Sequence, residues 1–243
     1  MLRKIGSLAG RSVHATDGEL GKVDEFIFDD KTWAIRYMVV ETGNWLSGRK
    51  VLISPSALKT PDRGSKIFSV ALTYEQVRTS PDIDTHKTVS RRHELALQKH
   101  YAWPACAGNG TFPAAWEEVR KPKSQASSKQ AREDVNLRST RAVTGYSLHA
   151  ADGLIGHVRD YIIDDRRWLI RFLVADTGTW LPGRKVLIWP HWIKRVKSET
   201  SEVFVGLPRE VIRNSPEFNQ GRPVSEDYEK ALYEYYERHS TDG

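Results

Sequence analysis

Short stretches in which apolar and polar residues alternate recur along each half of the chain, and they predict β-strands. Residues 33–40 are the clearest case, because one alternate set is Trp33, Ile35, Tyr37 and Val39 and most of the eight side chains are aromatic or β-branched. Similar short candidates occupy residues 11–15, 20–28, 49–53 and 67–72. Turn-forming residues separate them, notably at 16–19 and 29–31. Closely spaced short strands predict an all-β fold, either a small barrel or a sandwich.

This pattern is written twice. Residues 10–81 align without a gap on residues 145–216, at a constant offset of 135, and 33 of the 72 aligned positions are identical. A repeat of this length is a whole small domain copied in tandem rather than a solenoid unit. We therefore expect a first domain over residues 1–103, a flexible linker over 104–140 rich in Ser, Gln and Lys, and a second domain over 141–243.

Each copy ends in helix signals. Thr73 with Gln76 predicts a capping box at the start of a short helix over residues 73–78, and Pro208 suits the first turn of its counterpart. Longer helices are expected over residues 90–101 and 225–237. Their apolar stripes are His93, Ala96, Leu97, His100 and Tyr101, and Tyr228, Ala231, Leu232, Tyr235 and Tyr236. The stripes indicate either helices that cover a barrel of this chain or helices that enter a groove of a partner.

Composition narrows the class of protein. The chain has 243 residues, 39% of them hydrophobic, and no apolar run near the roughly 20 residues that span a bilayer. No apolar N-terminal stretch resembles a secretory signal, and the single cysteine, Cys106, excludes an internal disulfide framework. We expect a cytoplasmic protein without membrane insertion.

The net charge of +6 is unevenly distributed. Residues 1–103 carry 16 basic and 12 acidic residues, residues 104–140 carry 6 and 4, and residues 141–243 carry 15 and 15, which gives +4, +2 and 0. A dedicated nucleic-acid binder concentrates Lys and Arg on one surface. Because the second copy is neutral, a duplicated basic face is not expected and RNA is the less favoured partner.

The repeated polar residues are more easily explained by structure than by catalysis. Asp17 and the pair Asp29–Asp30 recur in the second copy as Asp152 and Asp164–Asp165, at predicted turns where an aspartate caps its own backbone. His14 and His149 have no second ligand at metal-binding spacing in their copies. We therefore expect no catalytic residue, no metal site and no cofactor.

The best surface candidate is the loop over residues 41–50 and its copy over residues 176–185. Each places a tryptophan between two glycines and beside an Arg-Lys pair, a composition typical of binding hot spots. The candidate partner-binding residues are Trp45, Arg49, Lys50, Trp180, Arg184 and Lys185. The alternative is that the two indoles close the barrel ends and shield the core.

Several runs of residues form a recognisable set. They are SLAGR at 7–11, TDGELGKV at 16–23, FIFDD at 26–30 and WAIRY at 33–37, with ADGLIGHV at 151–158 and WLIRF at 168–172 in the second copy. Together they resemble the PRC-barrel domain, the small β-barrel of the photosynthetic reaction centre H subunit and of the ribosome-maturation factor RimM. The resemblance covers roughly residues 5–80 and 140–215 and implies two tandem PRC-type barrels, each followed by helices. The membrane helix of the H subunit and the N-terminal domain of RimM have no counterpart here, so the chain looks more like stand-alone bacterial tandem PRC-barrel proteins.

The function expected from these features is a non-enzymatic protein-binding or scaffold module that acts through an unidentified protein partner or as a homo-oligomer. Two alternatives follow from the resemblance alone. One is an RNA- or ribosome-associated assembly factor, as for RimM, and the other is an accessory protein of photosynthesis or electron transport, as for the H subunit. Since one fold hosts many functions, the residues of the site have to decide among them.

Overall fold

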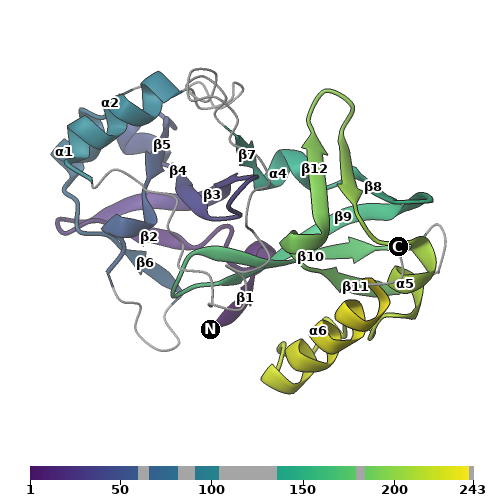
Figure 1. Ribbon diagram of the computed structural model, residues 1–243. Coiled ribbons are helices and arrows are strands. Elements are labelled where there is room, and N and C mark those ends of the chain that lie inside the picture. Colours follow the sequence, from purple (N-terminus) through teal and green to yellow (C-terminus); the bar gives the residue numbers. More distant parts are fainter. Residues whose placement is uncertain (60–65, 82–90, 104–135, 179–183, 241–243) are drawn as a thin grey trace. The chain divides into compact units, whose positions relative to one another are not determined.

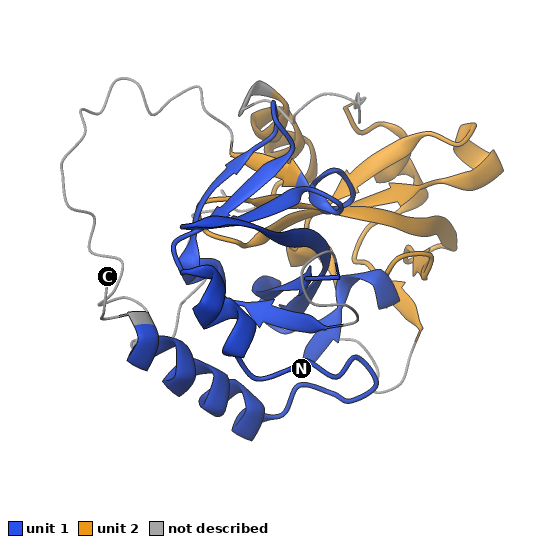
Figure 2. Cartoon of the chain, turned by 90° about the vertical axis from the view of Figure 1, so that its right-hand side faces the viewer, with its two compact units in different colours: residues 1–8, 139–243 blue, residues 9–138 orange. Residues whose placement is uncertain are grey.

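The computed structural model describes residues 1–59, 66–81, 91–103, 136–178 and 184–240 (Figure 1). The chain divides into two compact units, which Figure 2 colours separately. Unit 1 contains residues 1–8 and 139–243, and unit 2 contains residues 9–138. The first eight residues therefore belong to the unit that holds the second copy.

Unit 2 contains one sheet with the strand order β5-β4-β3-β2-β6, and β7 pairs with β3. The long strands β3 and β4 form its centre as an antiparallel pair, whereas β2 and β6 pair in parallel. The strands are β2 (Ser12–His14), β3 (Glu19–Asp29), β4 (Ile35–Glu41), β5 (Lys50–Ile53), β6 (Ile67–Ser69) and β7 (Leu137–Ser139). The other elements are η2 (Gly43–Leu46), η3 (Pro55–Ala57), α1 (Tyr74–Arg78) and α2 (Arg91–Tyr101).

Unit 1 repeats this plan with the order β11-β10-β9-β8-β13-β12, and β1 pairs with β9. Its strands are β1 (Leu2–Lys4), β8 (Ser147–Ala150), β9 (Gly153–Asp164), β10 (Leu169–Asp176), β11 (Lys185–Ile188), β12 (Ile193–Lys197) and β13 (Glu202–Val205). Its helices are η1 (Ile5–Ser7), α4 (Thr140–Val143), η4 (Pro190–Trp192), α5 (Arg209–Asn214) and α6 (Glu226–Ser240).

The expectation of a mostly β protein with short helices is confirmed. Within the described ranges, both sheets run as open strand orders, and no pairing closes either of them into a barrel. The two closed PRC-type barrels therefore remain a prediction. The expected linker lies largely at residues 104–135, outside the described residues, while residues 137–139 of that segment form β7.

The strand predicted over residues 33–40 begins later than expected. Trp33 has a φ of 61° and lies in the turn, and β4 starts at Ile35. All residues from Ile35 to Val40 are buried, so the half-exposed alternation is absent from this strand. The reason is that α2 covers one face: Arg36 and the hydroxyl of Tyr37 both contact Glu94 of that helix.

The helices form where the capping and stripe patterns predict them, but only part of each stripe is buried, since Ala96, His100 and Ala231 are exposed. Thr73 makes the capping box with Gln76 at the start of α1. Leu97 and Tyr101 of α2 are buried, as are Leu232 and Tyr236 of α6. The hydroxyl of Tyr236 donates to the carbonyl of Leu187 in β11, so α6 covers the sheet of its own unit. Within the described residues, no helix combines the length and the apolar character needed to cross a membrane.

The repeated glycine motif has a steric cause. A Cβ atom at Gly21 would lie 2.0 Å from the carbonyl oxygen of Glu41, and one at Gly156 would lie 2.0 Å from that of Asp176. Both glycines also have φ near +140°, a conformation that side chains disfavour. Glycine at these positions lets two neighbouring strands approach closely in each copy.

Candidate functional site

The Trp45 loop is partly built into the sheet. Its indole N–H donates to the carbonyl of Leu20 at 2.6 Å, and its ring meets the ring of Tyr74 edge-on at a centroid distance of 4.6 Å. The residue nevertheless keeps 36% of its surface exposed. Trp45 is therefore held in place by Leu20 and Tyr74 and keeps an exposed aromatic edge.

The basic residues of the same loop hold the fold together. The Arg49 guanidinium donates to the carbonyls of Arg78 and Ser80, at 3.3 and 2.6 Å, and the Lys50 ammonium pairs with Asp24 at 2.9 Å. Arg49 therefore ties the end of α1 to the loop. Both cations were predicted to bind a partner, but their side chains make these contacts within unit 2.

The end of the second loop is anchored by its own two basic residues. Arg184 donates to the carbonyl of Ser215, the counterpart of Ser80, and Lys185 donates to the side-chain carbonyl of Gln220 at 3.0 Å. Trp180 lies outside the described residues. The expectation that this loop presents an indole equivalent to Trp45 therefore stays a prediction.

The repeated aspartates have three different roles, of which only one is capping of their own turn. Asp29 accepts the backbone N–H groups of Lys31 and Thr32, and Asp164 accepts that of Arg166, as expected. In contrast, Asp17 and Asp152 accept the first N–H groups of the helices α1 and α5, 57 residues downstream. The remaining pair, Asp30 and Asp165, holds a short strand that precedes the other copy in the sequence, which we call an exchanged strand.

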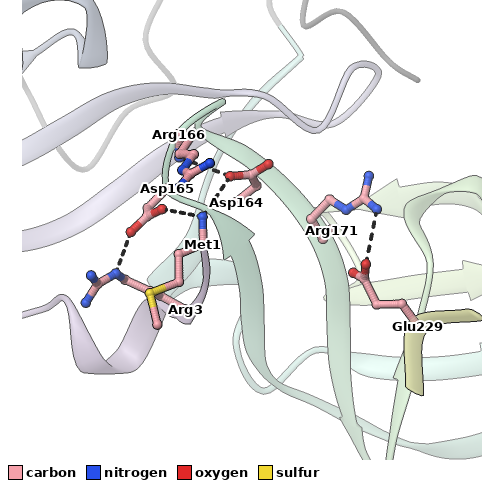
Figure 3. A network of polar contacts seen from close by, with 7 residues as sticks. All are labelled: Met1, Arg3, Asp164, Asp165, Arg166, Arg171 and Glu229. Atoms are coloured by element: carbon pink, nitrogen blue, oxygen red, sulfur yellow. Dashed lines mark hydrogen bonds and ion pairs between the residues drawn. The ribbon is translucent and has the colours of Figure 1, made fainter. Parts of the chain in front are cut away.

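In unit 1 that strand is β1, which runs antiparallel to β9. Leu2, Arg3 and Lys4 lie opposite Asp164, Ile163 and Ile162. The guanidinium Nε of Arg3 donates to Asp165 at 2.5 Å (Figure 3).

The N-terminal ammonium of Met1 contributes a second contact to Asp165, at 2.8 Å. Burial alone would raise the pKa of the Asp165 carboxyl. The hydrogen bonds from the N-terminal ammonium and Arg3 outweigh that effect, so its pKa lies below the ordinary value.

Two further contacts hold the segment around β1. Lys4 donates to the carbonyl of Gln220 at 2.6 Å, and the backbone N–H of Gly6 donates to Asp160 at 3.1 Å. Ile5 and Leu8, which follow, are buried. The first eight residues are thus anchored in unit 1 by their backbone, their charges and their apolar side chains.

Unit 2 contains the counterpart. Arg138 of β7 donates through Nε to Asp30 at 3.0 Å, and Leu137 is 3% exposed. Burial raises the pKa of the Asp30 carboxyl, an effect that the charge of Arg138 only partly offsets. The two exchanged strands therefore use one arrangement, offset by 135 residues. We call the Asp165 end of β9 the β9 edge site and the Asp30 end of β3 the β3 edge site.

A separate basic and aromatic face lies on β12, β13 and β8 of unit 1. Phe204 lies opposite Arg195 on one side and His149 on the other. The Arg195 guanidinium and the Lys197 ammonium lie 4.9 and 5.1 Å from the ring centroid, and the His149 ring stacks on it at 5.3 Å. Glu202 is the acidic neighbour, 3.4 Å from His149. In the first copy the position of Phe204 is a serine, Ser69, so this face belongs to the second copy.

This face was missed because the charge of residues 141–243 sums to zero. Opposite charges elsewhere in the unit hide the local arrangement, and only the strand register brings Arg195, Phe204 and His149 into one row. Among the described residues no group of three or more His, Cys, Asp or Glu side chains is placed to hold a metal ion. Cys106 lies outside the described residues.

Comparison with known families agrees with the motif in the first half. Residues 3–77 match the model of the PRC-barrel domain. No curated protein matches the chain. The family match covers the first copy, and the second copy is linked to it by the internal repeat of 33 identical positions in 72. The match therefore indicates one PRC-barrel domain, a domain type that suggests a protein-interaction module.

Proposed function

We propose that this chain is a non-enzymatic protein-binding module of the bacterial cytoplasm, built from two PRC-barrel domains. The PRC-barrel match supports this function, since that domain suggests a protein-interaction module. The observation that carries the proposal is the pair of edge sites, where each sheet holds an extended segment of chain that is distant in sequence. A sheet edge that accepts a strand recognises polypeptide backbone, which is the chemistry of a protein partner.

The proposal keeps the two tryptophan loops as additional contact surfaces. Trp45 offers a fixed aromatic edge, and Trp180 is its counterpart in the repeat. The basic residues of the two loops act mainly by positioning them, because their side chains form contacts within their own units. These residues are Arg49, Lys50, Arg184 and Lys185.

Affinity capture from the native cell, with mass spectrometry of what co-elutes, tests the proposal. We expect a defined protein partner that survives ribonuclease treatment. Trp45→Ala combined with Trp180→Ala should reduce its capture, whereas Lys230→Ala, an exposed control on α6, should not. Absence of any reproducible protein partner would contradict the proposal. A large fall in the melting temperature of the double variant would assign the indoles to the lid role instead.

RNA binding is the second candidate, and the basic and aromatic face of unit 1 favours it. Arg195 and Lys197 supply two cations beside the ring of Phe204, a combination that nucleic-acid binding surfaces use. Fluorescence anisotropy with a single-stranded RNA oligonucleotide tests this function. The RNA-binding function requires that the affinity for the oligonucleotide falls steeply between 50 and about 200 mM salt and that binding is lost in Arg195→Ala/Lys197→Ala. Binding that is absent or insensitive to salt would remove the candidate.

A further inference from the structure

The edge sites exist because one long strand in each sheet, β9 or β3, extends beyond the shorter strand that pairs with its edge, β8 or β2. β9 has 12 residues, whereas β8 has four and pairs with the first part of β9, from Gly153 to His157. The edge beyond β8 would leave backbone N–H and C=O groups without partners, a situation that proteins avoid or exploit for strand addition. β1 covers it at residues 162–164. In unit 2 the same relation holds between β3, with 11 residues, and β2, with three.

Both covering strands have the same sequence feature. β1 begins with Leu2–Arg3 and β7 begins with Leu137–Arg138. In each case the arginine Nε donates to the aspartate at the end of the long strand, at 2.5 Å in unit 1 and 3.0 Å in unit 2. The ion pairs are shielded, because the carboxylate side chains of Asp165 and Asp30 are only 12% and 6% exposed.

The same two aspartates also recognise the backbone. The N–H of Asp165 donates to the carbonyl of Met1 at 3.1 Å, and the N–H of Asp30 donates to that of Asn136 at 2.8 Å. Each aspartate thus binds the carbonyl of the residue before leucine and the guanidinium of the residue after it. Both edge sites therefore bind an extended segment of the form X-Leu-Arg.

From these two matching sites we infer that the β9 and β3 edge sites bind an extended X-Leu-Arg segment of a partner protein, which displaces the internal strand. This inference rests on the proposed function and specifies its partner. A strand of three residues is a small element to open locally, and Arg3 keeps 29% of its side chain exposed. β1 thereby acts as a built-in competitor, and the partner supplies the same backbone and guanidinium contacts in trans.

The chemistry of the sites favours this occupant. A shielded carboxylate beside backbone groups that pair with an added strand attracts a cationic peptide and repels the phosphates of RNA. Because the leucine–arginine pair is present in both internal strands although Lys4 is replaced by Ser139, the pair is the shared element of the ligand.

Peptide binding to the full chain tests the inference. The probe is residues 1–8, acetylated, amidated and labelled at its C-terminal end, so that its own terminus carries no charge. Arg3→Glu places a second carboxylate beside Asp165 and should open the β9 edge site. We expect this variant to bind the probe at least about tenfold more tightly than the native chain does, because the native strand competes at an effective concentration in the millimolar range.

Matched controls define the specificity. Lys230→Glu, with the same change of charge on the exposed surface of α6, should bind the probe as weakly as the native chain. A probe with Arg3 replaced by glutamate should bind Arg3→Glu at least about tenfold more weakly than the native probe. Arg138→Glu with a probe of residues 136–143 repeats the test at the β3 edge site, and it decides the question if Arg3→Glu does not fold.

Equal binding of the arginine and glutamate probes, or no binding by folded variants at either site, would overturn the inference. Dimerisation of the native chain that Arg3→Glu abolishes, without probe binding, would also overturn it, since the occupant would then be a second copy. In either case capture of a partner from the cell could still succeed through the tryptophan loops. Failure of that capture is the separate result that would contradict the proposed function.

Discussion

The ion pair between β4 and α2 offers a prediction with an internal comparison. In unit 2, Arg36 lies 3.2 Å from Glu94, and the two side chains are only 9% and 4% exposed. Glu94 also accepts the hydroxyl of Tyr37 at 3.3 Å. Glu94→Ala removes one partner of this buried pair. We expect the free energy of unfolding to fall by about 3 kcal/mol.

Unit 1 contains the equivalent ion pair, with a longer distance between the charges and more exposed side chains. Arg171 lies 3.7 Å from Glu229 (Figure 3), with side-chain exposures of 16% and 21%. The residue that corresponds to Tyr37 is Phe172, which has no hydroxyl to donate. Both side chains are more accessible to solvent than their counterparts in unit 2, so Glu229→Ala should cost less, about 1 kcal/mol.

Urea unfolding followed by circular dichroism measures both changes, with hydrogen exchange in β4 and β10 to assign each loss to its unit. A double variant, Arg36→Met/Glu94→Leu, should recover most of the loss, since an apolar pair of similar volume needs no charge compensation. Equal losses for Glu94→Ala and Glu229→Ala, or no recovery in the double variant, would refute the argument that burial sets the magnitude.

The remaining predictions concern backbone approach, helix capping and pH. Gly21→Ala and Gly156→Ala should each destabilise the protein by about 3 kcal/mol or more, because the new Cβ meets a strand carbonyl, and thermal unfolding measures this. Thr73→Ala should cost about 1 kcal/mol through loss of the capping box; a loss near zero would contradict the cap assignment. The pKa of Asp165 is lowered on folding, so its stabilisation is present above pH 3.8 and is lost as pH falls through the folded value; Asp165→Asn should remove this acid sensitivity from the urea midpoint. Folding raises the pKa of the Asp30 carboxyl, so the stabilisation that comes from its protonated form is present below pH 3.8 and is lost as pH rises through the pKa of the folded state. Asp30→Asn should abolish this decrease of stability with rising pH.

Local rules explain why much of the fold could be predicted. The strands over residues 20–28 and 49–53 and the capping box at Thr73 depend on side-chain periodicity and on contacts a few residues apart. Trp33 was misplaced because a buried tryptophan at the edge of an alternating run looks like a strand residue, whereas the turn holds it at a positive φ. The sequence motif contains Gly21, but the reason that glycine is needed there is the carbonyl of Glu41, 20 residues away in the sequence.

The edge sites could not be predicted from the sequence. Leu2–Arg3–Lys4 has no strand pattern of its own, and its assignment to unit 1 depends on the unfilled edge of β9. Asp30 and Asp165 resembled turn caps because aspartate at a hairpin usually has that role. The basic residues beside Trp45 were predicted to bind a partner, since the sequence does not show that the carbonyls of Arg78 and Ser80 lie within reach of Arg49.

The exchange of strands between the two copies is the basis of both proposals, and amide hydrogen exchange measured by NMR tests it most directly. Arg3→Glu should accelerate exchange at the N–H of Asp165, which donates to Met1, and should leave the N–H of Asp30 unchanged. Arg138→Glu should do the reverse. Acceleration at Asp30 by Arg3→Glu, or at neither amide by either variant, would contradict the exchanged arrangement.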